Sequence, residues 1–292
     1  MLVSLERRAG LPLALDPRTA TLRWPDGISV GEVSERTLAE LAPFLADAAA
    51  RAERVVIYTV YRNMARREDL DRIRASRLRY DITVIPPGSF AGATREFFRT
   101  AGHYHASDPK SAVPYPEVYE VISGRAYWLL QRPARLLAGP ARLPAGQAGG
   151  PRPGDPATLG EIYAVEAGPG EKAVMLPGFG HLTANAFDEP LVMANWIRDD
   201  FAYDYGPYRA LRGGGYRIIC GSVPDTIEFE ENGNYREVPE LVKLRPREVP
   251  GLGLTRSRPL YALSGELEQL RFLCEPAAFA STLTLEHCYR AI

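Results

Sequence analysis

The sequence predicts an all-β fold, either a sandwich or a barrel. Short segments rich in β-branched and aromatic residues recur between residues 80 and 222. Turn signals separate these segments at intervals of roughly ten residues, a spacing typical of sandwiches and barrels. Hydrophobic residues make up 46% of the 292 positions and charged residues 24%, so the chain has enough apolar side chains to fill a core.

The first 79 residues predict a mixed helix and strand region. Ser34 is the expected N-cap of a helix, and Pro43 interrupts the apolar residues that follow at helical spacing. Residues 54–61 (RVVIYTVY) are β-branched and aromatic, which predicts a strand. Residues 67–79 (REDLDRIRASRLR) mix charges of both signs, which is typical of an exposed helix and does not indicate a nucleic-acid-binding stripe.

Residues 80–222 predict the core of the barrel. A hairpin is expected over residues 116–131, with Ser123 and Gly124 as its turn. Residues 160–185 predict two strands around a Gly-Pro-Gly turn. The remaining strands are expected in four segments: 80–88, 94–105, 189–197 and 216–223.

Two stretches differ in composition from this core. Residues 132–158 are rich in Pro, Gly, Ala and Arg, which predicts a long exposed loop. Residues 223–292 predict a hairpin and an extension, with a tight turn at Asn232-Gly233 and one helix within residues 264–276. Since no clear linker is visible, we expect a single domain made of residues 1–79, 80–222 and 223–292.

Charge and cysteine content exclude several classes of protein. Lys and Arg number 35 against 36 for Asp and Glu, and this balance argues against binding to nucleic acid. The three cysteines form no CxxC pair, so neither a zinc ribbon nor a disulfide framework is indicated. The start of the chain lacks the apolar core of a signal peptide, and no apolar run approaches the ~18 residues of a membrane span. We therefore expect a cytoplasmic protein without membrane contact.

Three of the four histidines lie next to the strands and turns of the predicted core. His103 and His105 are two residues apart, so on a strand both side chains face the same side. Glu117 and Tyr119 form a second pair of this kind, and His181 follows a Pro-Gly turn. Three imidazoles and one carboxylate inside one barrel would suit one divalent ion of Fe, Mn, Ni, Zn or Co.

The order of these motifs resembles a known family. GHYH (102–105), EVY (117–119) and PGFGHLTAN (177–185) resemble the paired motifs of the cupin superfamily. More narrowly, TREFFRTAGHYH, EVYEVISGRAYWLLQ and the spacing of Pro177, His181 and Asn185 resemble the cupin-type glucose-6-phosphate isomerases of archaea and some bacteria. DEP (188–190), DYG (204–206) and ENG (231–233) extend a similarity that runs from about Val55 to Val238.

The resemblance implies a fold, a site and a partner. The fold is a cupin, a double-stranded β-helix or jelly-roll barrel, with flanking helices at the N-terminus and an extension at the C-terminus. A homodimer is implied as well. The implied metal ligands are His103, His105, Glu117 and His181, and the implied sugar-phosphate contacts are Thr83, Thr100, Gly102 and Tyr119.

Three positions depart from the family pattern. Tyr203 stands where the family usually carries a His, Ile197 where it often carries a Tyr, and Gly178 where it carries an aromatic residue. These positions line or adjoin the expected pocket. They therefore bear on the identity of the substrate more than on the fold or the metal.

The resemblance implies an aldose–ketose isomerase that interconverts glucose 6-phosphate and fructose 6-phosphate. The expected acid–base residues are Glu117 and Tyr205, with Tyr119 and Tyr203 as further candidates for proton relay. Coordination to a cation would lower the basicity of Glu117, so transfer of a proton and transfer of a hydride both remain open. An Fe(II)-dependent cupin dioxygenase, or a sugar-binding cupin without catalysis, would carry the same metal ligands.

Overall fold

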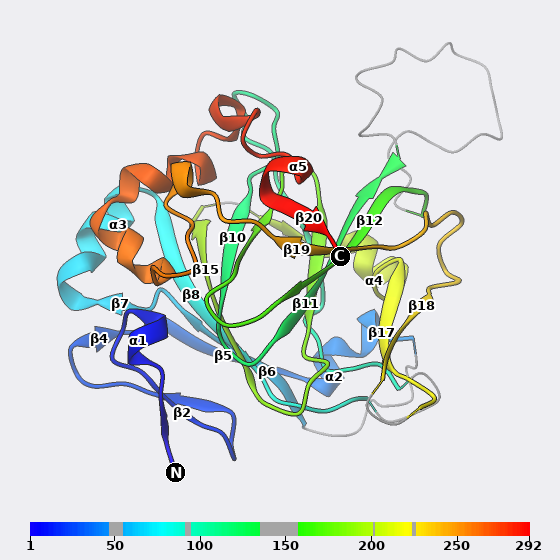
Figure 1. The fold of residues 1–292 in the computed structure, drawn as a ribbon, viewed down its shortest axis with the longest axis horizontal. Helices are drawn as coiled ribbons and strands as arrows, with labels where there is room; N and C mark the ends of the chain where they lie inside the picture. Colours follow the sequence, from blue (N-terminus) through cyan, green and yellow to red (C-terminus); the bar gives the residue numbers. More distant parts are fainter. Residues whose placement is uncertain (47–54, 91–94, 135–156, 201, 224–225) are drawn as a thin grey trace.

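Two large β-sheets form the body of the protein in a computed structural model that describes residues 1–46, 55–90, 95–134, 157–200, 202–223 and 226–292 (Figure 1). Both sheets contribute side chains to one hydrophobic core. Helices are short and lie at the periphery (Figure 1). The predicted all-β fold is confirmed. Most of the expected loop at 132–158 lies outside the described residues, and its structure is not assigned.

The larger sheet has six antiparallel strands in the order β13-β10-β15-β8-β6-β5. It includes the strand expected at residues 54–61, which forms β6 in the structure. The bounds of its strands are β5 Glu32–Thr37, β6 Val56–Arg62, β8 Leu78–Ile85, β10 Glu117–Ser123, β13 Lys172–Met175 and β15 Leu191–Arg198.

The second sheet has five strands in the order β14-β11-β12-β19-β20, and β12 and β19 are its only parallel neighbours among the described strands. The bounds are β11 Ala126–Pro133, β12 Leu159–Ala167, β14 Gly180–Ala184, β19 Val242–Pro246 and β20 Tyr289–Ala291. Small sheets join β9 Tyr104–His105 with β16 Tyr203–Asp204, β17 Tyr216–Cys220 with β18 Ile227–Glu231, and β4 Ile28–Ser29 with β7 Ala65–Arg66.

The hairpin predicted over residues 116–131 is wrong, because its two strands belong to different sheets. β10 pairs with β13 and β15, whereas β11 pairs with β12 and β14. Gly124 has φ +77°, and a Cβ there would lie 2.7 Å from the backbone oxygen of Pro190. Glycine therefore allows the chain to cross from one sheet to the other at this corner. The segment 160–185 likewise supplies three strands, β12, β13 and β14, where two were expected, and they alternate between the sheets.

The hairpin predicted around Asn232-Gly233 is also wrong, although a turn does form there, in which the Tyr235 N–H donates to the backbone oxygen of Asn232 at 2.9 Å. β18 ends at Glu231 and pairs antiparallel with the preceding strand, β17. Residues 226–238 therefore form no hairpin of their own. The side chain of Asn232 is fully buried and donates hydrogen bonds to the backbone oxygens of Leu211 and Gly214, both at 2.9 Å. This asparagine satisfies buried carbonyl groups of the preceding loop.

The N-terminal region differs from its prediction in where the helix begins. Ser34 lies within β5, and the cap is Thr37, which forms a capping box with Glu40. The region also contains β1 Val3–Ser4, β2 Ala14–Asp16 and β3 Thr21–Arg23, and the helices α1 Glu6–Ala9, α2 Leu38–Leu41 and α3 Leu70–Ala75. Its described part also includes the 3-10 helices η1 Ala42–Phe44 and η3 Arg67–Asp69.

Residues 94–105 form less regular strand than predicted. Only β9 is a named strand in the described part of this segment, and the rest makes isolated bridges to residues of β14, β17 and a loop. Residues 67–79 were expected to be helical throughout, yet α3 ends at Ala75 and β8 starts at Leu78. α4 Gly206–Ala210 follows β16. No helix in the described part of the chain is both long and apolar enough to cross a membrane.

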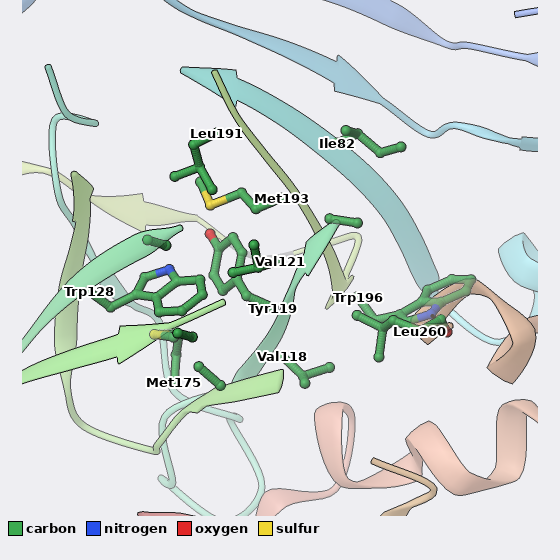
Figure 2. Packing of buried hydrophobic residues seen from close by; sticks show 14 of the residues in the cluster. Ile82, Val118, Tyr119, Val121, Trp128, Met175, Leu191, Met193, Trp196 and Leu260 are labelled. Atoms are coloured by element: carbon green, nitrogen blue, oxygen red, sulfur yellow. Dashed lines mark hydrogen bonds between the residues drawn. The ribbon is translucent and has the colours of Figure 1, made fainter. Parts of the chain in front are cut away.

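The C-terminal segment packs against the six-stranded sheet. Between β19 and β20 it consists of short helices, and the helix expected within residues 264–276 is a 3-10 helix. The indole nitrogen of Trp196 on β15 donates a hydrogen bond to the backbone oxygen of Leu260 at 2.9 Å, and Figure 2 shows the two residues side by side. The bounds are η5 Pro250–Leu252, η6 Leu260–Gly265, η7 Leu267–Leu273, η8 Pro276–Phe279 and α5 Leu285–Cys288. The division at residues 79 and 222 stays a prediction.

A buried ion pair joins β13 to β10, and its carboxylate also binds the backbone of the C-terminal segment. The Lys172 ammonium donates to Glu120 at 2.6 Å, and both side chains are about 2% exposed. The second carboxylate oxygen of Glu120 accepts the backbone N–H of Leu260, also at 2.6 Å. Glu120 thus satisfies one buried charge and one buried backbone donor at the same time.

Replacing Lys172 with Met should lower the free energy of unfolding by ~3–5 kcal/mol, because it leaves the buried Glu120 carboxylate without its cation. Urea denaturation of the parent and the variant measures this difference. Lys110→Met is the matched control, since Lys110 is exposed and should cost almost nothing. Equal losses in the two variants would contradict the assignment.

Candidate metal centre

The structure brings His103, His105, Glu117 and His181 together. One potential ligand atom from each residue lies within 4.8 Å of the others. Glu117 and His181 are buried, and the two other histidines are half-buried. Their role as metal ligands stays a prediction, but the four side chains that the motif spacing singled out do converge.

Backbone pairing fixes these positions. His103 and His181 exchange two backbone hydrogen bonds, of 3.1 and 3.0 Å, although 78 positions separate them in the sequence numbering. His105 follows on β9, and Glu117 is the first residue of β10. The His103 and His105 rings stack at 5.0 Å between centroids, so the expected same-face arrangement is observed.

The spacing of the polar atoms fits a single ion. Nε2 of His103 lies 3.1 Å from Nε2 of His105, and Oε2 of Glu117 lies 3.4 and 3.3 Å from Nε2 of His105 and His181. Ligands bound at ~2.1 Å to one ion lie roughly 3.0–3.4 Å apart for angles of about 90–109°. Within the described residues, Oε2 of Glu117 is buried without a hydrogen-bond partner. A cation would satisfy that atom.

The protonation states also suit a metal. Burial lowers the pKa of His103 well below its ordinary value, and burial likewise lowers the pKa of His181. Burial acts to raise the pKa of Glu117, but contacts with His105 and His181 outweigh it and hold that pKa below its ordinary value. Neutral imidazoles and an ionised carboxylate are the forms that bind a cation.

Further hydrogen bonds orient two of these groups. Nδ1 of His105 lies 2.8 Å from the backbone oxygen of Tyr115, and donation to that oxygen leaves Nε2 as the acceptor that faces the cluster. The side-chain amide of Asn195 donates to Oε1 of Glu117 at 2.6 Å. Sequence reasoning missed Asn195. Asn195 is two residues from Met193 on β15, so the two side chains share a face, and this spacing is the signal that could have placed Asn195 on the inner face.

A hollow opens beside the cluster, with about 590 Å³ of empty space including its mouth. The residues predicted to contact substrate or to act in acid–base chemistry all line it, and so do three of the four cluster residues: Thr83, Thr100, Gly102, Tyr119, Tyr205, His103, Glu117 and His181.

The environment of these residues refines their expected roles. The Thr100 hydroxyl accepts the backbone N–H of Thr183 at 2.9 Å and keeps its own proton for donation. Gly102 has φ +81°, and a Cβ there would meet the Tyr208 ring at 2.5 Å, so packing alone requires glycine. Burial raises the pKa of Tyr119 and of Tyr205, which keeps both hydroxyls protonated near neutral pH.

The hollow also contains charged residues that sequence reasoning did not include. Arg36, Arg62 and Asp81 line it. Oδ2 of Asp81 accepts a hydrogen bond from Arg79 at 2.8 Å and lies 3.5 Å from Arg62. The sequence alone could not place Arg36 and Arg62 in the hollow, because their position there depends on how the strands pair.

Of the three departures from the family pattern, only Tyr203 is found among the described residues that line the hollow. Its ring packs edge-on against His103, 4.5 Å between centroids, and its hydroxyl accepts a hydrogen bond from Arg79. Tyr203 therefore contacts a predicted metal ligand. The fourth histidine, His287, is exposed on α5 and remote from the cluster.

Comparison with known proteins identifies relatives over most of this region. A family model described as "Glucose-6-phosphate isomerase (GPI)" matches residues 35–231. The glucose-6-phosphate isomerase of Thermococcus kodakarensis is 25% identical over 206 residues, covering 69% of this chain and 87% of the relative. That of Pyrococcus furiosus is 26% identical over 210 residues, covering 70% and 85%.

A solved structure of oxalate decarboxylase from Bacillus subtilis aligns with 50% of this chain and 27% of that chain, at 20% identity and a TM-score of 0.29. A TM-score this low supports no inference. The family model, in contrast, covers more than half of the chain and includes all four residues of the cluster. The chain belongs to the glucose-6-phosphate isomerase family.

Proposed function

We propose that this protein is a metal-dependent aldose–ketose isomerase that interconverts glucose 6-phosphate and fructose 6-phosphate. The observation that carries the proposal is the convergence of three imidazoles and one carboxylate beside a hollow lined by hydroxyl groups. Membership of the glucose-6-phosphate isomerase family supplies the substrate class.

The centre would hold one divalent ion through His103, His105, Glu117 and His181. Imidazole-rich sites with one carboxylate suit Fe, Mn, Ni, Zn or Co, whereas Mg and Ca prefer oxygen ligands. When bound, such an ion supplies Lewis acidity toward the substrate oxygens at C1 and C2.

The chain's own residues then bind and orient the sugar phosphate. The hydroxyls of Thr83, Thr100 and Tyr119 and the amide of Gly102 provide donors for the substrate's oxygens. Tyr205, protonated near neutral pH, can donate to a developing oxyanion.

Glu117 is the candidate to move a proton between C2 and C1. Asn195 holds one of its oxygens in place, and the other faces the imidazoles. Direct hydride transfer between the two carbons is the competing route. Solvent deuterium that appears at C1 or C2 of the product identifies the proton route, and its exclusion identifies the hydride route.

We further propose a cytoplasmic homodimer. β5 pairs only with β6 among the described strands and so forms an edge of the six-stranded sheet. Val33 on this strand is 50% exposed, and Trp24 nearby in the sequence is 37% exposed. An exposed edge with apolar side chains is suited to pairing with a second copy.

The proposed reaction is tested by a coupled assay for isomerisation of fructose 6-phosphate. Activity should disappear with a chelator and return with one of the divalent metals. Activity that survives complete metal removal would refute metal dependence. Oxygen uptake without isomerisation would identify a dioxygenase, and sugar-phosphate binding without turnover would identify a non-catalytic binding protein.

His181→Ala should abolish both metal retention and isomerase activity, because it removes one of the four proposed ligands, and a buried one. Metal content per chain, measured by atomic emission, checks this expectation. His287→Ala serves as the control, since His287 is exposed and remote from the cluster. Retention of a full metal complement by the His181 variant would contradict the site.

Asn195→Leu should weaken metal affinity or activity by roughly 10- to 100-fold, because Glu117 loses the donor that orients it. Metal titration and the coupled assay report the two effects separately. Asn234→Leu provides a comparison at an exposed asparagine outside the hollow. Equal behaviour of the two variants would show that Asn195 does not orient the carboxylate.

A further inference from the structure

One arginine in the hollow differs from its neighbours in how its charge is compensated. Arg36 lies on β5 directly opposite Tyr58 of β6, and both line the hollow. The other arginine in its lining, Arg62, lies opposite Glu32 at the far end of the same strand pair. Tyr58 and Arg62 are four residues apart on β6, so their side chains face the same side of the sheet. Arg36 faces that side as well, because it lies opposite Tyr58. Both arginines therefore project from the inner face of the sheet.

A buried carboxylate pairs with Arg62, whereas the carboxylate that pairs with Arg36 is exposed. Asp81, only 2% exposed, lies 3.5 Å from Arg62 and 2.8 Å from Arg79. Arg36 instead pairs with Glu40 at 3.4 Å, and the two side chains are 40% and 48% exposed. An ion pair so exposed to water is weak and exchanges readily for another anion.

Glu40 is also engaged elsewhere. Its Oε2 atom accepts hydrogen bonds from the Thr37 backbone at 2.8 Å and the Thr37 hydroxyl at 3.0 Å. These bonds complete the capping box of α2. The carboxylate that neighbours Arg36 is therefore held by the start of a helix, and Arg36 can turn toward a ligand without disturbing it.

Arg36 also lies close to the segment that carries Thr100 and Gly102. Tyr58, which lies opposite Arg36 on the neighbouring strand, lines the same hollow as Ala101. Ala101 and its two neighbours in sequence all line the hollow. Arg36 and the segment that carries the Thr100 hydroxyl and the Gly102 amide thus line one hollow.

We propose that Arg36 is a specificity-determining residue that binds the phosphate group of the substrate together with Thr100 and Gly102. This inference rests on the proposed function and adds a cation to a site that hydroxyl and amide donors were expected to form alone. The planar guanidinium donates two parallel hydrogen bonds to phosphate oxygens. A dianionic phosphate then replaces Glu40 as the partner of Arg36, and an unphosphorylated sugar cannot.

The test compares variants of the metal-loaded full-length chain. Arg36→Gln should raise the Kd for inorganic phosphate, measured by calorimetry, by roughly 10- to 100-fold, the effect of one charge-assisted hydrogen-bonding group. The KM for fructose 6-phosphate should rise by a similar factor, with a smaller change in kcat. Arg18→Gln, at an arginine that is 82% exposed and outside the hollow, should change neither constant.

Two further variants separate binding from a structural role. Arg36→Lys keeps the charge but loses the planar fork, so its Kd should fall between those of the parent and Arg36→Gln. Glu40→Gln retains the capping hydrogen bonds and removes the competing charge, so phosphate affinity should rise by roughly two- to fivefold. A purely structural ion pair would lower the Tm in both cases and leave phosphate affinity unchanged.

The outcomes for the inference and for the proposed function are distinct. If the parent isomerises fructose 6-phosphate but folded Arg36→Gln shows the parent's KM and phosphate Kd, the inference is overturned and the proposed function stands. If phosphate binding depends on Arg36 but no isomerisation occurs, the anion site stands and the proposed function fails. If Arg36→Gln does not fold, Arg36→Lys and Glu40→Gln decide the question.

Discussion

The candidate centre depends on one buried carboxylate oxygen. Oε2 of Glu117 faces the imidazoles of His105 and His181 and has no hydrogen-bond donor in the described part of the chain. An ionised oxygen in such a place costs several kcal/mol unless a positive charge lies beside it. His103 and His181 do not readily supply that charge, because burial lowers the pKa of both. A bound cation resolves both difficulties at once, which is why the group fits a metal better than a hydrogen-bonded core.

The antiparallel register explains how the floor of the hollow is assembled. Tyr119, Asn195 and Asp81 lie opposite one another across β10, β15 and β8. Because side chains alternate between the two faces of a strand, these three residues all project inward. A shift of one residue in any strand would move its polar group to the other face. The hydrogen bond from Asn195 to Glu117 therefore follows from the pairing of β10 with β15.

Some of this arrangement could be predicted from the sequence and some could not. The two-residue period placed His103 with His105, and Glu117 with Tyr119, on common faces, because that period is local. Gly124 looked like a hairpin turn, since a sequence window does not reveal that the strands on either side pair in different sheets. Arg36 went unrecognised for the same reason. It lies in a charged strand, and only the pairing with Tyr58 directs it to the hollow.

The same alternation connects the C-terminal extension to the centre. Glu117 and Tyr119 face the hollow, whereas Glu120 projects from the opposite face of β10 and accepts the Leu260 backbone N–H. On neighbouring strands, Trp196 and Tyr80 also project outward, and both rings contact Tyr261. The last part of the chain therefore buries the outer face of the strands whose inner face forms the hollow. It contributes no residue to the lining of that hollow within the described chain, so its effect on the centre is to fix the position of β10 and thereby of Glu117.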